Sequence, residues 1–402
     1  MSDANRVGLA YVVESTYGTT PSGPPTLKNL RFTSESLQKK TSTVTSQELR
    51  SDRNTTDLIR VDQNAGGDMQ IEFSYSAFDD WMEYALLSDA TWPSAVDISH
   101  NSGSDAITIA TSGSNFTLTL TTTNWVALGL NATTSVGKWV RLASFTAAAN
   151  NGYAKIVSIT GSNKVLTVTQ LAMSAGTQNS GTVTVRQMPE IKTGVTLKSM
   201  SIEKSYTDLS STFAVYTGMC IDGFSLDFAV GAVAKGSFSL IGKNEVSGSA
   251  TVGTGTNTAA PTFSVMNTVD HISALMEGGT ALSITKLSLA LKNNLRARGQ
   301  IATLGAISIG TGAIEVTGSI EAYFTSNTLL DKYRNMTATS LALKIVDASS
   351  NAYVIDLPNV KFSDGKAVST GINTDVFLTL NFTAIMHSTE LIAMRIARST
   401  AP

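Results

Sequence analysis

The sequence predicts a mainly β protein in which one domain is duplicated and an unrelated small all-β domain is inserted into the first copy. Composition is the first observation: only 15% of the 402 residues are charged, and Ser, Thr and Gly fill the polar positions, as in β-rich chains with many turns. The second observation is a strand-then-helix pattern at 66–87 that returns loosely at 310–335. The third is a run of short strands at 93–190 that has no counterpart elsewhere.

The segments around the repeated pattern recur in the same order. The matched pairs are residues 26–33 with 281–291, 199–208 with 340–349, and 213–226 with 352–362. The spacing from Leu27 to Leu282, less the inserted stretch, is the length of one ordinary domain. Because short alternating strands also resemble each other by chance, a coincidence of β-patterning is the alternative to duplication.

Turn residues between these patterns divide the chain into parts. The predicted parts are a first unit at 1–92 and 191–245, an inserted β-sandwich or barrel at 93–190, a flexible linker at 246–262, a second unit at 263–387 and a C-terminal tail at 388–402. The tail is compatible with a short helix that ends in Arg395 and Arg398. Because the insertion carries its own strands and turns, we expect the first unit to tolerate its deletion.

The strand at 68–76 alternates apolar and polar side chains, which predicts one packed and one wet face. The packed face is Met69, Ile71, Phe73 and Tyr75, and the wet face is Asp68, Gln70, Glu72 and Ser74. A short helix is predicted to begin near Ser76 as its N-cap, with Asp79 and Asp80 in the first turn. The helix stripe predicted to pack on the sheet is Phe78, Trp81, Met82 and Leu86.

Residues 37–65 form a long polar excursion between two strands of the first unit, and residues 291–312 occupy the same place in the second. Charges of both signs are interspersed along the first excursion. A solvated hairpin is one interpretation. Docking against a neighbouring subunit is the other, because excursions of this length in compact domains are usually functional or disordered, and mixed charge suits an interface.

The sequence offers little for catalysis, so we expect no enzyme, no cofactor and no metal site. His100, His271 and His387 stand apart without metal-ligand spacing and are interpreted as surface or boundary residues. No nucleophile elbow, phosphate-binding loop, C-x-x-C or H-E-x-x-H motif occurs. The single cysteine, Cys220, excludes an internal disulfide and lies in an apolar strand pattern, where a small buried hydrophobe is expected.

Charge and hydropathy exclude further classes. A net charge of -2 argues against a free nucleic-acid binder, which would normally be basic. The first residues lack the apolar core of a signal peptide, and no stretch of 18 apolar residues predicts a membrane span. The chain is therefore expected to be made and kept in the cytoplasm, unless it is carried out as part of something larger.

Three segments, taken in order, resemble the major tail tube protein of long-tailed, non-contractile bacteriophages. They are residues 67–87, 199–243 and 291–324, and the most specific parts are the step from Lys204 to Asp208 and the hairpin at 224–243. The resemblance covers nearly the whole chain apart from the insertion and lies in pattern and order. It implies a β-sandwich or half-barrel with one helix in each unit, assembled into rings whose inner strands close a barrel. Stacked rings would form the tube through which the genome leaves the capsid.

Because such rings hold six copies of the fold, a duplicated chain implies a trimer with pseudo-sixfold symmetry; a hexamer is the alternative. The resemblance also implies tape-measure, tail-terminator and baseplate or tip proteins as partners, DNA that passes without specific binding, and a place in the virion tail after assembly in the host cytoplasm. The insertion would lie outside the tube. The competing hypothesis is another all-β virion protein or a surface adhesin whose insertion binds a host surface.

Two sets of residues follow as candidates within this resemblance. The wet strand faces that would line the lumen are Asp68, Gln70 and Glu72 in the first unit and Glu315, Thr317, Ser319 and Glu321 in the second. The basic residues of the two excursions that would contact the next ring are Arg50, Arg53, Arg60, Lys292, Arg296 and Arg298.

Overall fold

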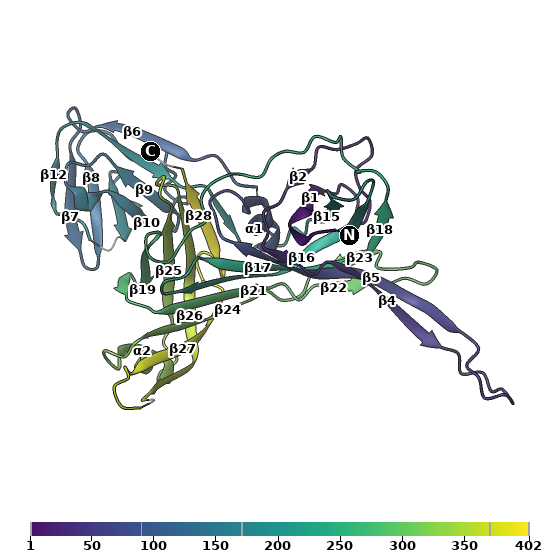
Figure 1. The fold of residues 1–402 in the computed structure, drawn as a ribbon. Coiled ribbons are helices and arrows are strands. Elements are labelled where there is room, and N and C mark those ends of the chain that lie inside the picture. Colours follow the sequence, from purple (N-terminus) through teal and green to yellow (C-terminus); the bar gives the residue numbers. More distant parts are fainter. Residues whose placement is uncertain (1, 90, 170–171, 370, 401–402) are drawn as a thin grey trace. The chain divides into compact units, whose positions relative to one another are not determined.

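A computed structural model describes residues 2–89, 91–169, 172–369 and 371–400 (Figure 1). The chain is mainly β, as predicted, and its two α-helices in the described residues are short. It divides into two compact units. Unit 1 comprises Met1–Ser88, Gly194–Met266 and Ser288–Thr317, and unit 2 comprises Asp89–Thr193, Asn267–Leu287 and Gly318–Pro402.

Unit 1 is built around a sheet whose longest strands are β5 and β16. Its elements are a 3-10 helix (Ala4–Arg6), β1 (Val7–Val13), β2 (Lys28–Asn29), β3 (Ser34–Glu35), β4 (Gln38–Thr45), β5 (Leu58–Glu72), α1 (Asp79–Ala85), β15 (Met200–Tyr206), β16 (Phe213–Ala229), β17 (Lys235–Gly242), β18 (Asn244–Gly248), β22 (Arg296–Arg298) and β23 (Ser308–Gly310). β15 pairs with β1 and with β16, whose first half also pairs with β18. The second half of β16 pairs with β17, β17 with β5, and β5 with β4.

Unit 2 contains a second sheet with the same pairing order. Its strands outside residues 93–190 are β19 (Ile272–Glu277), β20 (Thr280–Leu282), β25 (Thr339–Val346), β26 (Ala352–Val368), β27 (Phe377–Ala384) and β28 (Arg395–Ser399), with α2 (Thr328–Arg334). β25 pairs with β19 and with β26, whose first half also pairs with β28 and whose second half pairs with β27. Two strands, β21 (Lys286–Lys292) and β24 (Glu315–Tyr323), have residues in both units.

The two sheets therefore match strand for strand. Strand set 1 (β1, β15, β16, β18, β17, β5) corresponds to strand set 2 (β19, β25, β26, β28, β27, β24), since β24 pairs with β27 as β5 does with β17. The 17-residue strands β16 and β26 each shift register against two partner strands. β16 shifts against β15 between Tyr216 and Met219 and against β17 after Ile221, and β26 shifts against β25 between Leu357 and Val360 and against β27 after Phe362. Such an irregularity bends a strand, which lets each half pair with different neighbours. This agreement supports one structural unit used twice.

Residues 93–190 form a separate eight-stranded antiparallel sheet in unit 2. Its order is β12 (Gly176–Gln178), β7 (Ile107–Ser112), β8 (Asn115–Leu120), β11 (Val165–Thr169), β10 (Gly152–Thr160), β9 (Trp139–Ala143), β13 (Thr182–Gln187) and β6 (Val96–Asn101), with a 3-10 helix at Ala148–Asn150. This agrees with the run of short strands that was predicted for these residues. Alternating side chains such as Ile107, Leu118, Leu166 and Val183 close one core around Trp125.

The first predicted strand is confirmed as far as Glu72, and the helix stripe is confirmed. Ser74, predicted on the wet face of that strand, lies beyond the end of the strand and is fully buried, and the helix begins later than predicted. Met69, Ile71 and Phe73 are at most 1% exposed, and Phe78 and Trp81 pack against Phe238 at ring-centroid distances of 6.1 and 5.3 Å. The helix begins at Asp79, and its N-cap residue Phe78 makes no side-chain capping hydrogen bond. Ser76 has φ 63°, in the left-handed region, so it belongs to the turn before the helix.

The C-terminal tail is a strand, which corrects the expectation of a helix. β28 lies between β26 and β14 (Glu190–Lys192), with Ile396 opposite both Ile355 and Ile191. Arg395, expected near a helix end, is only 3% exposed. The residues predicted as linker also make ordered contacts with unit 1: the Val252 N–H donates to Glu203 (2.7 Å) and the Thr258 N–H to the Leu27 carbonyl (2.7 Å).

A buried carboxylate fastens one loop of the insertion. Asp105, 6% exposed, accepts hydrogen bonds from the backbone N–H groups of Thr121, Thr122 and Thr123 at 3.0, 2.7 and 2.9 Å. Burial would raise the pKa of Asp105, but the hydrogen bonds from Thr123, Thr122 and Thr121 outweigh burial and lower the pKa to about 2.

We expect Asp105→Asn to destabilise the insertion by about 2 kcal/mol at pH 7, since the folded pKa lies below the unfolded value of about 3.9. The contribution of the Asp105 carboxylate to stability is fully present above pH ~4. It is lost as the pH falls through about 2, where Asp105 of the parent protein becomes protonated. Hydrogen exchange at residues 96–187 would measure the difference. A gap between parent and variant that persists at pH ~2 would contradict this origin.

Candidate assembly surfaces

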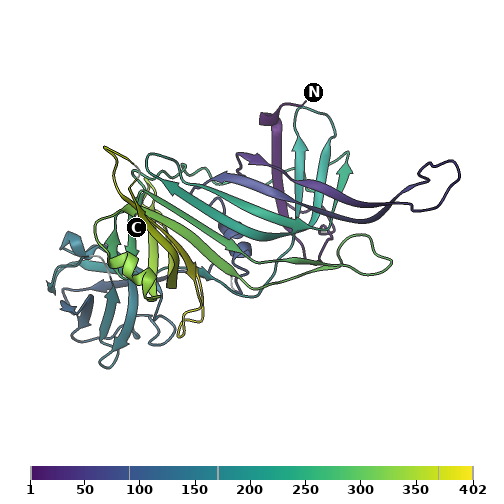
Figure 2. The ribbon, with the colours of Figure 1, turned by 90° about the horizontal axis from the view of Figure 1, so that it is seen from below.

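Strands β4 and β5 continue together beyond the rest of unit 1 as a two-stranded arm, residues 38–66 (Figures 1 and 2). Their register runs from Gln38 opposite Gly66 to Thr45 opposite Leu58. The arm exposes five aliphatic side chains: Val44 (51%), Leu49 (102%), Leu58 (63%), Ile59 (48%) and Val61 (54%). An isolated hairpin is marginally stable in water, and single exposed aliphatics are common, but five on one arm indicate an interface.

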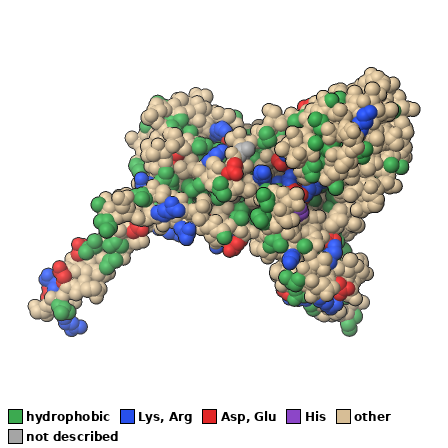
Figure 3. Space-filling view, turned by 180° about the vertical axis from the view of Figure 1, so that it is seen from behind, with side chains coloured by type: hydrophobic (Ala, Val, Ile, Leu, Met, Phe, Trp, Pro, Cys, Tyr) green, Lys and Arg blue, Asp and Glu red, His purple; other side chains and the backbone are tan. Residues whose placement is uncertain are grey.

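Charged residues near the tip of the arm are partly neutralised by each other. Arg50 donates from Nε and one Nη to both carboxylate oxygens of Asp52, at 3.0 and 2.7 Å. Hydrogen bonds from the Arg50 side chain and the Asn54 backbone lower the pKa of Asp52 to about 2. Arg53 and Arg60 are exposed. Hydrophobic and charged surface therefore alternate along the arm (Figure 3).

The second excursion is a small hairpin of β22 and β23 that is anchored at its base in unit 1. Leu295, Ala306 and Ile309 form a buried cluster with Cys220. The Asn293 side chain donates to the Ala85 and Ile221 carbonyls at 2.9 and 3.1 Å. The exposed residues of this excursion include Ile301 (96%) and the candidates Lys292, Arg296 and Arg298. Arg296 donates to the Thr311 carbonyl at 3.3 Å.

The candidate lumen residues lie on polar strand faces. On β5, Asp68 and Gln70 are exposed and Glu72 is half-buried; on β24, Glu315 and Thr317 are exposed and Ser319 and Glu321 are half-buried. Cross-strand pairs extend the β5 face onto β17, where Ser239, Ser237 and Lys235 oppose Asp68, Gln70 and Glu72. The extended face on β5 and β17 is therefore rich in hydroxyl groups and carries few positive charges.

Two strand edges differ between otherwise equivalent strands. The second half of β16 pairs with β17 on one side and with β21 on the other, where the Ser288 hydroxyl donates to Asp227 at 2.6 Å. The second half of β26 pairs with β27 alone among the described residues. The registers likewise give β4 one partner, β5. Unpaired edges present rows of free N–H and C=O groups to another chain.

The insertion is joined to strand set 2 by a shared core and a buried ion network. Trp139, Tyr153 and Met188 pack with Met276 and Val354 in one cluster. Lys155 of β10 lies 3.0 Å from both Asp356 and Glu390. Arg395 pairs with Glu390, with Glu190 (3.1 Å) and with Asp356 (3.2 Å). Burial lowers the pKa of Lys155, and the Asp356 carboxylate opposes that shift.

The residues considered for catalysis do not converge. Contrary to expectation, His100 and His271 are buried: the His100 Nε2 group bonds the Asp105 carbonyl at 2.7 Å, and His271 Nδ1 accepts from the Asn267 N–H at 2.9 Å. Cys220 is fully buried, and burial raises the pKa of its thiol to about 12. Within the described ranges no group of three metal-ligating side chains forms, and no helix is long and apolar enough to cross a membrane.

A comparison with protein families decides the identity of the chain. A family model described as phage tail tube protein matches residues 4–384. The chain belongs to the phage tail tube protein family. Family membership makes it a structural, β-rich component of the bacteriophage tail tube, located in the virion tail, that assembles with copies of itself and with tail partners. A comparison with curated proteins finds no match.

The sequence interpretation missed two features, which are the exposed aliphatic side chains of the arm and the buried ion network of Lys155. Three of the five exposed aliphatics of the arm lie in the segment Leu58–Val61, where they interrupt a polar excursion, and that local signal was available. The Lys155 network gave no such signal, because its members lie far apart in the chain and meet only through β10, β14, β26 and β28.

Proposed function

We propose that this chain self-assembles into rings, that the rings stack into the tail tube, and that the tube conducts genome DNA into the host. The observation that carries the proposal is the matching pairing order of strand sets 1 and 2 in a member of this family. Two equivalent units in one chain support a ring of three chains with pseudo-sixfold symmetry, since a heterologous contact that closes gives a cyclic assembly. Tape-measure, terminator and tip proteins would contact its ends, and assembly would take place in the host cytoplasm.

Ring closure follows from the unequal strand edges. Within unit 1, β21 covers the edge of β16; β21 precedes β24 in the chain as β4 precedes β5. The uncovered edge of β26 would then accept β4 of the next chain in the equivalent way. Each ring would thereby cover the open edges of β4 and β26, and the insertion would remain on the exterior.

Cysteine cross-linking tests this closure. Ser288 is the third residue of β21, and it contacts Asp227, which lies two residues before the end of β16. The position equivalent to Ser288 is Lys40 of β4, and the position equivalent to Asp227 is Lys366 of β26; both lysines are exposed. We expect K40C combined with K366C to give covalent dimers and trimers on oxidation, because paired strands bring Cα atoms to about 5.5–6 Å. Cysteine substitutions at Lys39 and Ala367 test registers that differ by one residue from this alignment.

A mixture of the two single variants should yield only dimers, and T56C combined with K366C should yield no cross-link. Native Cys220 is buried and does not interfere. Rings that form without any cross-link at these positions would contradict the β4–β26 contact and leave ring assembly standing. Electron microscopy that finds neither rings nor tubes would overturn the proposed function itself.

The polar faces of β5 and β24 would line the lumen in this assembly. Asp68, Glu72, Glu315 and Glu321 would keep DNA mobile, because an acidic or hydroxyl-rich wall repels phosphate whereas a basic wall binds it with strong salt dependence.

We expect D68K combined with Q70K to slow DNA ejection from virions, because the added lysines would bind phosphate. The delay should shrink as the salt concentration rises, since the logarithm of the binding constant falls with the logarithm of salt concentration by about 0.9 per neutralised phosphate. The matched control, T111K with S112K, adds two lysines to exposed positions of the insertion and should not slow ejection. Equal delay in both variants would remove Asp68 and Gln70 from the lumen.

A further inference from the structure

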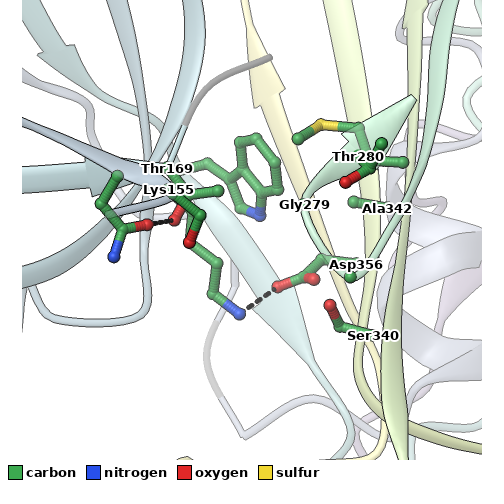
Figure 4. Close-up of a pocket in the computed structure, with 12 residues that line it drawn as sticks. Lys155, Thr169, Gly279, Thr280, Ser340, Ala342 and Asp356 are labelled. Atoms are coloured by element: carbon green, nitrogen blue, oxygen red, sulfur yellow. Dashed lines mark hydrogen bonds and ion pairs between the residues drawn. The ribbon is translucent and has the colours of Figure 1, made fainter. Parts of the chain in front are cut away.

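A cavity of about 190 Å³ lies in unit 2 between the insertion and strand set 2 (Figure 4). Lys155 and Thr169 of the insertion form one wall, and Gly279, Thr280, Ser340 and Asp356 of strand set 2 form the other. Assembly into rings or tubes assigns no role to this cavity.

A residue that lines the cavity carries an unpaired donor. Trp139 is 2% exposed, and its indole Nε1 has no hydrogen-bond partner among the described residues. Buried tryptophan N–H groups usually find an acceptor, and leaving one unpaired is destabilising. A ligand bound in the cavity could therefore supply an acceptor for the Trp139 N–H.

Glycines keep one end of the cavity open. Gly278 and Gly279 form the two-residue turn between β19 and β20, with φ 58° and 83°, a conformation that favours glycine at both positions. A Cβ at Gly279 would come within 3.3 Å of the Thr169 methyl carbon. The turn approaches the insertion closely and leaves no side chain in the opening.

The charges around the cavity disfavour an anion. Lys155 is held at 3.0 Å by both Asp356 and Glu390, so its charge is already compensated, and the Asp356 carboxylate itself lines the wall. Hydroxyl groups of Thr280 and Ser340 add neutral polar contacts, while Met276 and Ala342 add apolar surface. These walls suit a neutral ligand with hydroxyl groups on some sides and C–H groups on others.

We propose that this cavity binds one neutral, hydroxyl-rich ring, the chemistry of a single sugar unit. A sugar hydroxyl can accept from the Trp139 N–H and donate to Asp356 or Ser340, while a C–H face rests on Met276 and Ala342. The cavity is smaller than the roughly 300–1,000 Å³ of sites for drug-sized ligands, which fits one ring better than an oligomer. The tail tube would thus carry a sugar-binding site at each insertion.

Calorimetric titration of the full chain with D-glucose, D-galactose and N-acetyl-D-glucosamine tests this site, with inorganic phosphate as the anion probe. We expect saturable binding of at least one sugar with a Kd of about 1 mM, and no binding of phosphate. Trp139→Phe keeps the ring and removes the N–H, so it should weaken binding about fivefold to tenfold.

A second variant guards against misfolding of the first. Thr280→Trp at the exposed rim should block the cavity and abolish binding, whereas Thr325→Trp, at an exposed position that does not line the cavity, should leave binding unchanged. The proposal is overturned if none of the three sugars binds by about 20 mM, if phosphate binds instead, or if Thr280→Trp binds like the parent.

Discussion

Replacing the aliphatics of the arm should yield soluble chains and rings that do not stack. In the variant L58Q, I59T and V61T, three side chains that are 48 to 63% exposed in the free chain become polar. Burial of each aliphatic side chain at an interface contributes about 1.5–3 kcal/mol, so the three together should raise the critical concentration for tubes at least about 100-fold. Light scattering and electron microscopy would measure it.

The matched control is T41S, T43S and T45S, which changes three exposed polar residues of the same arm and should polymerise like the parent. R50E with R53E should have a smaller effect, confined to low salt, because Arg50 is already bonded to Asp52 and exposed ion pairs are weak and screened by salt. If the aliphatic variant forms tubes at the parent's concentration, the arm has no part in stacking.

The predictions of strands and helices that proved correct rest on local periodicity. Met69, Ile71 and Phe73 alternate with polar residues, and Phe78, Trp81 and Met82 share a helical face, so these elements could be found from neighbouring residues alone. The short strands within residues 93–190 could be predicted for the same reason, since turn residues separate them. The lumen, stacking and ring predictions remain proposals.

The errors arose where distant segments decide the structure. β28 is buried on both faces, as Arg395, Ile396 and Ala397 are each at most 3% exposed, so it shows neither helical nor alternating periodicity. A buried arginine is acceptable there only because Glu190, Asp356 and Glu390 surround it. His100 was interpreted as a surface or boundary residue because its partner, the Asp105 carbonyl, cannot be inferred from side-chain identity.

Deleting residues 94–189 should destabilise strand set 2, although the sequence alone predicts that the deletion is tolerated. The deletion removes Trp139, Tyr153 and Met188 from a core shared with Met276 and Val354. It also removes Lys155, the insertion's partner of the buried Asp356. Losing one partner of a buried pair costs about 3–5 kcal/mol, and the uncovered apolar face adds to that cost. Hydrogen exchange of β25, β26 and β28 in the deleted chain would measure the loss.

Two further variants separate the causes of that loss. Lys155→Met keeps the insertion and removes only its buried charge, and we expect a lower Tm, while Lys192→Met at an exposed position should leave Tm unchanged. Adding M276Q and V354T to the deletion should restore solubility, because the newly uncovered face becomes polar, without restoring the ion network. A deleted chain that melts with the parent and shows unchanged exchange at β26 would mean that the insertion contributes nothing to strand set 2, whatever its contacts.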